Sequence, residues 1–386
     1  MKISWSGKSH NYTFKEKKYF LNILNNADVL TQGPELDKFE NSLRNYLGSK
    51  NIYCTSSAAA SLEIISDLIN INKGDEIIIP AHTYCATAIP FAKKGAKIIW
   101  ADIDFQTRTI DINDVKKKVT KKTKAIIIVD LYGYAVDIRP FKKLKKNIKI
   151  IHDCAQSLGA EILNRKSGML ADFACYSFHS QKNITTLGEG GAVFVKNNNL
   201  AKAVKGLRHN GHRPYSKLRK KYWKPAMVNT DLDIKDRWPH KFTLSEIQCA
   251  AGHMLMERLD NLNLKRISRA KKIIKNLHGE KLIFNLDNKN NKHVYHLLTA
   301  YVNPKYIKRD KLIEDLYKKY RIQSIVQFYP LYKYPLFKKM NFGKANCPIT
   351  EKYYKNMISF PFHVWLSEDQ INYMIKSIKT CIDSKK

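Results

Sequence analysis

Short apolar runs alternate with helical patterns between residues 52 and 195 of this 386-residue chain. The runs are mostly continuous, which is typical of strands covered on both faces of a sheet. The window 58–70, which lies between two of the runs, places Leu62, Ile65 and Ile69 on one face of a helix. This rhythm predicts a mostly parallel, doubly wound α/β sheet, with strands at 77–80, 97–101, 125–129, 148–152, 173–178 and 191–195.

A second group of patterns begins near residue 244 and predicts further elements toward the C-terminus. Apolar residues at helical spacing cover 244–259 and 310–320, and residues 295–302 have the composition of a strand. The last helix is expected to begin with a capping box, because Gln370 follows Ser367 by three positions. These elements predict a smaller α/β domain after the large sheet.

The chain therefore divides into an N-terminal arm with a large domain at 1–255, and a small domain at 256–386. Residues 212–240, which are rich in charge, proline and tryptophan, are expected to form a long loop. The N-terminus has no apolar segment of the secretory type, and no run of about 18 apolar residues appears anywhere. We expect a cytoplasmic protein without a membrane span.

The formal net charge of +34 is extreme and bears on the choice of partners. A basic surface can bind nucleic acid because it displaces counterions from phosphates. The basic residues are scattered, however, and no zinc-finger spacing, RNP-like sequence or basic heptad helix accompanies them. We therefore expect no nucleic-acid partner and attribute the charge to a lysine-rich composition. Its positive field would also attract an anionic substrate such as a nucleotide diphosphate sugar.

Neither the cysteines nor the histidines predict a metal site. The seven cysteines form no CxxC pair and are expected to be small buried thiols in a reducing cytosol. His209 and His212 lack both a third ligand and a helix that would hold their spacing, so we interpret them as loop residues.

The most informative chemistry surrounds Lys182. It lies on a loop of small and polar residues between Ser177 and the glycine-rich run 188–191, and Asp153 follows the predicted strand at 148–152. Pyridoxal phosphate requires a lysine amine, with which its aldehyde forms a Schiff base. It also requires a carboxylate that keeps its pyridinium nitrogen protonated. Lys182 and Asp153 meet both requirements, so we predict that they hold this cofactor.

Eight segments, in order along nearly the whole chain, resemble the DegT/DnrJ/StrS family of pyridoxal phosphate-dependent nucleotide-sugar aminotransferases. They are 30–35 (LTQGPE), 74–80 (GDEIIIP), 83–84 (TY), 95–97 (GAK), 153–156 (DCAQ), 245–248 (SEIQ), 329–331 (YPL) and 359–361 (SFP). The resemblance implies the aspartate-aminotransferase-like α/β fold, called fold type I, with a large cofactor-binding domain and a smaller C-terminal domain. It also implies a homodimer with shared active sites.

The resemblance assigns a role to each residue around the cofactor ring. Lys182 is expected to carry the cofactor and, once the amino donor displaces it, to move the proton between donor carbon and cofactor. Burial should lower the pKa of its amine, since attack requires the neutral form. Asp153 is expected at the pyridinium nitrogen, Gln156 at the ring hydroxyl and Tyr84 stacked on the ring. The family usually has an acidic residue where His152 stands, which changes the electrostatics around Asp153.

The cofactor phosphate is expected at the start of a helix. Ser57, Ala58 and Ala59 open the predicted helix directly after an apolar run, and the free N–H groups at such a start favour an anion. The family usually has glycine and a hydroxyl residue where Ala58 and Ala59 stand, so the backbone cradle remains but one side-chain contact is lost. Ser177 resembles the family serine that contacts the same phosphate. The run 188–191 is expected to allow tight backbone approach beside the lysine loop.

Contacts beyond the cofactor follow from weaker similarity. Lys241 stands near a family position that reaches the cofactor phosphate of the partner subunit. His179 is expected to line the site, and Tyr329 and Tyr332 are expected to contact the substrate. Many family members have histidine where Tyr332 stands, so the substrate contacts of this segment depart from the family pattern.

These residues predict transamination of a nucleotide-linked keto-deoxysugar, at C4 rather than C3, with glutamate as the amino donor. The amino sugar would enter polysaccharide or glycan biosynthesis, such as that of lipopolysaccharide O-antigen. A first alternative is a dehydratase or isomerase of the same family, but members that dehydrate sugars carry histidine in place of Lys182. A second alternative is a basic nucleic-acid-binding protein with a vestigial fold. The joint presence of Lys182, Asp153, Gln156 and Ser177 argues against it.

Overall fold

The computed structural model describes residues 1–6, 10–145, 147–211, 234–235, 237–285, 288 and 290–383. The segment 212–240, for which the sequence predicts a long loop, lies largely outside these residues. Within the part of the chain that the structure describes, no helix combines the length and the apolar character that a membrane crossing requires.

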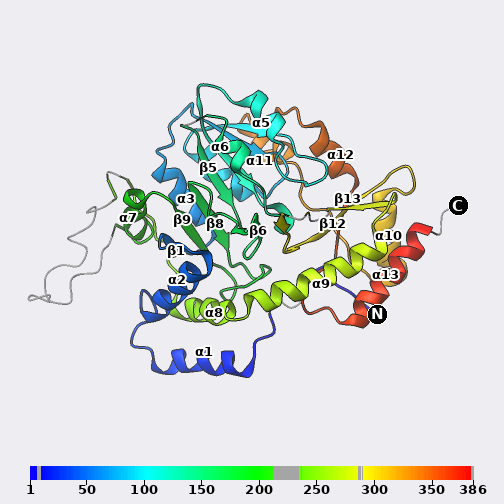
Figure 1. Ribbon diagram of the computed structural model, residues 1–386, viewed down its shortest axis with the longest axis horizontal. Helices are drawn as coiled ribbons and strands as arrows, with labels where there is room; N and C mark the ends of the chain where they lie inside the picture. Colours follow the sequence, from blue (N-terminus) through cyan, green and yellow to red (C-terminus); the bar gives the residue numbers. More distant parts are fainter. Residues whose placement is uncertain are drawn as a thin grey trace, which may run out of the picture.

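A seven-stranded sheet lies at the centre of the larger domain (Figure 1). Its strands are β1 (Ile52–Thr55), β2 (Glu76–Pro80), β3 (Lys97–Ala101), β4 (Thr123–Val129), β5 (Lys149–Asp153), β8 (Phe173–Ser177) and β9 (Gly191–Val195). Their order across the sheet is β1-β9-β8-β5-β4-β2-β3. Strand β9 runs antiparallel to β8 and β1, and the other pairs are parallel. The mostly parallel sheet predicted from the apolar runs is confirmed.

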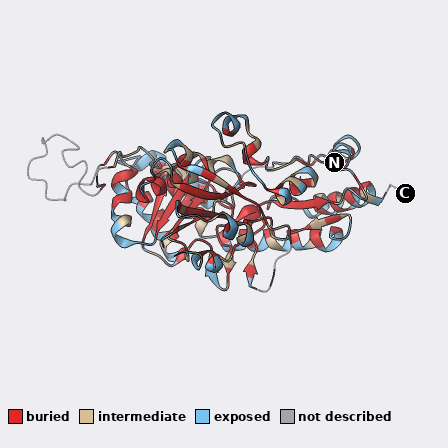
Figure 2. Ribbon diagram, turned by 90° about the horizontal axis from the view of Figure 1, so that it is seen from above, coloured by how far each residue is buried: buried red, intermediate tan, exposed pale blue. Residues whose placement is uncertain are grey.

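Apolar side chains pack on both faces of this sheet, which explains why its strands are continuously apolar. Ile77 and Ile79 of β2 belong to one core cluster, whereas Ile78 belongs to another on the opposite face. Helix α3 (Ala58–Leu68) covers the first face and contacts β8 and β9. In Figure 2 the buried strands lie in the middle of the molecule and the exposed surfaces lie on the surrounding helices.

A three-stranded antiparallel sheet forms the core of the C-terminal part. It consists of β10 (Leu282–Phe284), β12 (Leu298–Val302) and β13 (Met357–Phe360), in that order. Helices α9 (Leu259–Leu277), α10 (Arg309–Tyr320) and α13 (Glu368–Asp383) supply side chains to the same core. Ile3 also lies in this core and pairs with Ile322, so the first residues of the N-terminal arm pack on the smaller sheet. Figure 1 shows the N-terminus beside α13.

Capping residues set the helix boundaries in this part of the chain. Ser245 forms a capping box with Gln248, so α8 (Glu246–Met256) begins two residues after the start of the predicted window. The capping box predicted for the last helix is present. The Ser367 N–H donates to Gln370 Oε1 at 2.9 Å, and the Gln370 N–H donates to Ser367 Oγ at 3.1 Å.

Helix α9 connects the two sheets and, in Figure 1, runs below them from α8 toward α13. The predicted domain boundary at residue 255 falls in the last turn of α8, directly before it. Helices α1 (Phe14–Asn26) and α2 (Pro34–Leu47) pack against α8. Helix α1 lies at the periphery, and its outward side chains are exposed.

Short elements complete the described structure. They are η1 (Cys85–Thr87), α4 (Ile89–Lys93), α5 (Ile112–Lys118), η2 (Leu131–Gly133), α6 (Arg139–Lys142), β6 (Glu161–Ile162), β7 (Arg165–Lys166), α7 (Asn198–Leu207), β11 (Asn291–Lys292), η3 (Leu331–Lys333), α11 (Pro335–Lys339) and α12 (Pro348–Asn356). Strands β11, β6 and β7 form a small third sheet.

Candidate active site

A cavity of about 490 Å³ opens where β4, β5 and β8 end. Val129, Asp153 and Ser177 come from those three strand ends, which meet because the strands are parallel neighbours. Nine residues singled out from the sequence line this cavity: Ser57, Ala58, Ala59, Tyr84, Asp153, Gln156, Ser177, His179 and Lys182. The fold thus brings together residues that are up to 125 positions apart in the chain.

Lys182 lies on the loop between β8 and β9, where its backbone N–H donates to the His179 carbonyl at 2.8 Å. The surrounding protein encloses its amine, and this burial lowers the pKa to about 8 from 10.5. The carboxylates of Asp153 and Glu189 oppose the effect because negative charge near the amine favours its protonated form. The pKa lowering expected from the sequence is confirmed. At pH 7 about one tenth of this amine is therefore neutral.

The Asp153 carboxylate is held in place from several sides. Its Oδ2 accepts a hydrogen bond from Thr87 Oγ1 at 2.8 Å. Its Oδ1 accepts from the Ala155 N–H at 3.1 Å and from Cys175 Sγ at 3.5 Å. Because these partners belong to the rigid edge of the sheet and to η1, the carboxylate is oriented before any ligand binds.

Gln156 is oriented through its amide oxygen. Oε1 accepts a hydrogen bond from the Tyr132 N–H at 2.7 Å. The Tyr132 hydroxyl in turn donates to the Gln327 carbonyl at 2.7 Å and lies 2.6 Å from His82 Nε2. With its oxygen occupied, Gln156 retains its amide nitrogen as the group that can donate to a ligand in the cavity.

The start of α3 offers unpaired backbone donors to the same cavity. Ser57 caps the helix, since its Oγ accepts the Ala60 N–H at 3.0 Å. The N–H groups of Ala58 and Ala59 donate to no acceptor among the residues that the structure describes. The backbone of Gly191 passes so close that a Cβ there would lie 2.5 Å from the Ala58 nitrogen. The tight approach predicted for the glycine-rich run is thus confirmed.

The remaining predicted cavity residues are Tyr84, Ser177 and His179. Tyr84 is 55% exposed, and its ring centroid lies 6.0 Å from that of Phe328. Ser177 Oγ accepts the His179 N–H at 3.3 Å. The His179 Nε2 lies 3.7 Å from a carboxylate oxygen of Glu189. The side chains of Ser177 and His179 are therefore oriented by residues of the loop that carries Lys182.

Two predicted substrate contacts do not line the cavity. Tyr332 is buried, and its hydroxyl donates to Glu351 Oε1 at 2.5 Å. Tyr329 packs against Tyr334 and Tyr354, with centroids 5.5 and 5.2 Å away. The segment does reach the cavity, but through Gln327 and Phe328. Tyr332 lies in η3, after the stretch that reaches the cavity, and similarity to a motif did not determine which residues face inward.

Lys241 also lies outside the cavity lining, on the surface. Its neighbour Phe242 accepts a hydrogen bond through its carbonyl from the Ser56 N–H at 2.9 Å. Through Phe242, Lys241 therefore lies close in space to the start of α3, while its own side chain is exposed. His209 pairs with Lys241 as an isolated bridge, and His212 lies outside the described residues.

Sequence reasoning missed four ionisable residues that the smaller domain and the N-terminal arm contribute to the cavity lining: His10, Arg266, His296 and His363. For Arg266, the spacing of buried positions along the helix could have revealed it. Arg266 follows Leu262 and precedes Ala270 by four positions each, so it occupies the buried stripe of α9. A charged residue on such a stripe is costly unless it has a function or a partner.

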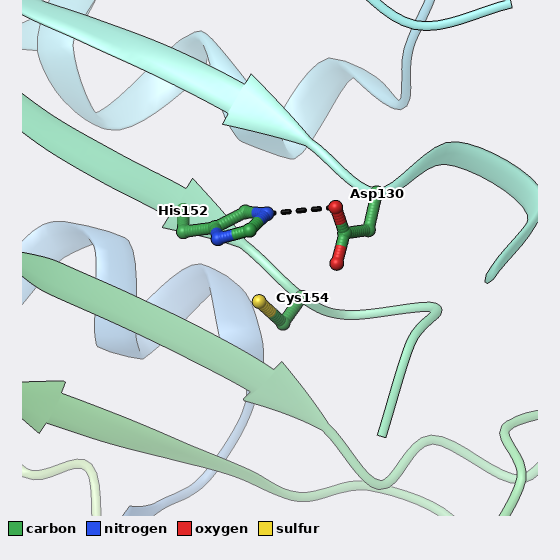
Figure 3. A group of neighbouring side chains, drawn as sticks. All are labelled: Asp130, His152 and Cys154. Carbon is green, nitrogen blue, oxygen red and sulfur yellow. Dashed lines mark hydrogen bonds and ion pairs between the residues drawn. The ribbon is translucent and has the colours of Figure 1, made fainter. Parts of the chain in front are cut away.

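A buried polar group lies directly behind Asp153. Figure 3 shows Asp130 and His152, which share a hydrogen bond of 2.7 Å, and Cys154 beside them. His152 and Cys154 flank Asp153 in the chain, so they point to the opposite face of the sheet from the cavity. Their ligand atoms lie within 4.8 Å of one another, which is short enough for a metal ion. Burial raises the pKa of the Cys154 thiol well above its usual value, however, whereas metal binding requires the thiolate. We therefore interpret Asp130 and His152 as a buried hydrogen-bonded pair with Cys154 beside it. The role of His152 is thus to bind Asp130.

The donor set of the cavity fits pyridoxal phosphate. A lysine amine with lowered pKa stands near a fixed carboxylate, and free N–H groups at a helix start provide an anion site. Lys182 would hold the aldehyde, Asp153 would hold the ring, and the N–H groups at the start of α3 would hold the phosphate.

Several known proteins are similar to this chain over nearly its whole length. The family model for the DegT/DnrJ/EryC1/StrS aminotransferases matches residues 12–379. The GDP-perosamine synthase of Vibrio cholerae is 26% identical over 367 residues, which are 94% of this chain and 95% of that one. The dTDP-3-amino-3,6-dideoxy-alpha-D-galactopyranose transaminase of Aneurinibacillus thermoaerophilus is 27% identical over 367 residues, 94% of each chain.

A solved structure of a sugar aminotransferase has the same fold as this chain. The sugar aminotransferase Spr1654 of Streptococcus pneumoniae, described as putative, in its pyridoxal phosphate form superimposes with a TM-score of 0.88 at 25% identity. The superposition covers 100% of this chain and 99% of that one. Fold type I, predicted from the sequence, is thereby confirmed. The chain belongs to the DegT/DnrJ/EryC1/StrS aminotransferase family and is a pyridoxal phosphate-dependent sugar aminotransferase.

Proposed function

We propose that this enzyme transfers an amino group from glutamate to a nucleotide-linked keto-deoxysugar. The observation that carries the proposal is the enclosed Lys182 amine, whose pKa is about 8 and whose anionic neighbour is Asp153. When bound, pyridoxal phosphate supplies an electron sink for the carbon that gains or loses a proton. Lys182 supplies the base at that carbon, because its amine is partly neutral near pH 7.

The other cavity residues hold and orient the cofactor in this proposal. Asp153, fixed by Thr87 and Cys175, would hold the ring nitrogen in its protonated form. Gln156 would donate its free amide N–H to the ring hydroxyl. Tyr84, whose side chain is exposed, would stack on the ring.

The phosphate binds at the start of α3 in this proposal. The N–H groups of Ala58 and Ala59 donate to it, and the positive end of the helix dipole adds to the attraction. Ser57 accepts a hydrogen bond through its oxygen, so its own O–H proton stays available for the phosphate. Ser177 has the same arrangement, since its oxygen accepts the His179 N–H.

The sugar substrate is proposed from the relatives and from charge. Their names specify GDP in one case and dTDP in the other, so both carriers are candidates here. A chain with a net charge of +34 attracts a nucleotide diphosphate through its overall field. We propose amination at C4, and the 3-amino product of the Aneurinibacillus relative makes C3 the position to compare. The amino sugar would enter polysaccharide or glycan biosynthesis in the cytoplasm.

We also propose a homodimer with shared active sites. Helix α1 exposes Phe14, Leu21 and Leu24 by 83%, 58% and 58%, and Leu30 beyond it is 53% exposed. An apolar group of this kind on a peripheral helix favours burial against a second copy. In such a dimer the outward Lys241 would reach the cofactor phosphate of the partner.

Mixing of inactive variants tests the shared site. Lys182→Ala and Lys241→Glu proteins should each lack activity, and a refolded mixture should regain part of it, because one site of each mixed dimer keeps both lysines. Sedimentation equilibrium supplies the oligomeric state. A monomer, or a mixture as inactive as its components, would exclude the shared site.

The visible absorbance of the purified enzyme, saturated with pyridoxal phosphate, tests the reaction itself. Glutamate should convert the band of the lysine-bound cofactor to that of pyridoxamine phosphate, and the aminated enzyme should then convert 4-keto or 3-keto nucleotide sugars, distinguished by NMR of the product. Lys182→Ala should lose the band and turnover together. A band that glutamate leaves unchanged would point to another donor or to the dehydratase and isomerase alternative. Turnover at the normal rate in Lys182→Ala would refute the proposal.

A further inference from the structure

Arg266 lines the cavity from the smaller domain although nothing in the cofactor arrangement uses it. It stands on the inward face of α9 and is 6% exposed. Its Nη1 donates to the carbonyls of Tyr295 and His296 at 3.4 and 3.3 Å, and its guanidinium lies 5.6 Å from the centroid of the Phe362 ring. These contacts hold the guanidinium in place but do not neutralise its charge.

No carboxylate among the described residues pairs with Arg266. Burial lowers its pKa to about 10, and the neighbouring Arg269 lowers it further rather than compensating. The guanidinium therefore remains charged near neutral pH. A buried cation without a counter-ion is costly, and arginines in such positions usually bind an anion. The acidic residues that line the cavity are Asp153 and Glu189, and neither contributes to the electrostatics of Arg266.

Three imidazoles surround this charge. His10, His296 and His363 line the same cavity, and burial is the main cause that lowers the pKa of each. Arg258 adds to the effect at His10 and Lys182 at His296, and Arg266 contributes at all three, so they are uncharged near pH 7. Each keeps a buried Nδ1 without a hydrogen-bond partner. This side of the cavity thus combines one fixed positive charge with polar groups that are still unsatisfied.

The positive charge also lies near Lys182. His296 is within electrostatic reach of both Lys182 and Arg266, and its carbonyl accepts a hydrogen bond from Arg266. His10 interacts with the backbone of Lys182 and with the charge of Arg266. His10 and His296 thus each interact with both Arg266 and Lys182, and all four residues line the same cavity.

We propose that Arg266, with His296 beside it, binds the α-carboxylate of the amino donor. This rests on the proposed function, in which an amino acid is the donor. Its carboxylate is attached to the carbon that bears the reacting amine, so it must lie next to Lys182. The diphosphate of a nucleotide sugar is separated from the aminated carbon by the sugar ring and must lie farther out. A planar guanidinium also matches a carboxylate with two parallel hydrogen bonds.

Binding of glutarate to the holoenzyme tests this subsite without any reaction. Glutarate has the two carboxylates of glutamate but no amine, and calorimetry measures its affinity directly. Arg266→Gln should weaken glutarate binding by a factor of about 10 to 100, because a hydrogen-bonded charge pair is lost. Arg266→Lys keeps the charge but loses the fork, and should fall between the two.

Arg269→Gln is the matched control. Arg269 stands one turn farther along the same helix, donates to the Val364 carbonyl and does not line the cavity, so its loss should leave glutarate affinity unchanged. GDP and dTDP serve as the second set of probes, and their affinities should change less than about twofold in Arg266→Gln. Uptake of pyridoxal phosphate checks that each variant folds.

The outcomes separate the two proposals. Equal glutarate affinity in the wild type and in Arg266→Gln, or a loss confined to the nucleotides, would overturn the subsite and leave the aminotransferase proposal intact. No glutarate binding by the wild type would overturn it as well. A loss of glutarate binding with no cofactor conversion by glutamate would instead support the subsite and refute glutamate as donor. Should Arg266→Gln fail to fold, Arg266→Lys decides the question, and wild-type affinity there would refute a need for the guanidinium fork.

Discussion

The lowered pKa of Lys182 predicts how the enzyme captures its cofactor as pH changes. Only the neutral amine attacks the cofactor aldehyde. With a pKa of about 8 the amine is neutral in about one molecule in ten at pH 7, whereas a pKa of 10.5 would leave about one in three thousand. Burial therefore raises the reactive fraction about 300-fold, which corresponds to about 3 kcal/mol.

The sign of the effect defines the pH window. Below pH 8 the rate of cofactor capture should rise about tenfold per pH unit, and above pH 8 it should level off because most of the amine is already neutral. Folding is linked to the same group. Since the folded protein binds fewer protons than the unfolded chain between pH 8 and 10.5, the buried amine destabilises it least at high pH.

Stopped-flow mixing of the cofactor-free enzyme with pyridoxal phosphate measures the rate through the absorbance of the lysine-bound form. N-acetyl-lysine reacted with the same cofactor is the control, and dividing the two rates removes the ionisations of the cofactor itself. The ratio should fall as pH rises from 8 to 10.5. Glu189→Gln should move the plateau to lower pH, because the Glu189 charge raises the pKa of Lys182. A ratio that stays constant from pH 6 to 10 would refute the reasoning.

Three further predictions follow from packing and hydrogen bonding. Gly191→Ala should weaken binding of pyridoxal phosphate at least about tenfold in a spectroscopic titration, because its Cβ would overlap Ser57 and Ala58, while Gly279→Ala, with open space around it, should not. Glu40→Gln should lower the free energy of unfolding by about 3 to 5 kcal/mol in urea, because Arg208 loses its buried partner, and a change below about 1 kcal/mol would contradict this. Lys318→Gln, in an exposed pair, should change it by less than about 1 kcal/mol. Thr87→Val removes the hydrogen bond to Asp153 without changing the shape, and should slow conversion of the cofactor by glutamate about tenfold at unchanged stability; a normal rate would show that Asp153 needs no such support.

Local patterns were sufficient for the framework of this protein. Continuous apolar runs identified six of the seven strands of the large sheet, all but β1, because a strand covered on both faces carries mostly apolar side chains. Side-chain capping identified the start of the last helix, since the two hydrogen bonds of the box join residues three apart. Lys182, Asp153 and the start of α3 could be singled out for the same reason, because each lies in a short segment with its own chemistry.

Tertiary structure alone decided which residues share the cavity with them. Arg266 belongs to α9, His10 to the N-terminal arm, and His296 to the segment just before β12. They line one cavity with Lys182 only because the small domain packs beside the large sheet. The same holds for Tyr332, whose hydroxyl faces Glu351 instead of the cavity. Position in the sequence constrains neighbours within a few residues. Burial, counter-ions and the direction of a side chain depend on elements that are distant in the chain, and these set the chemistry of the donor side of the site.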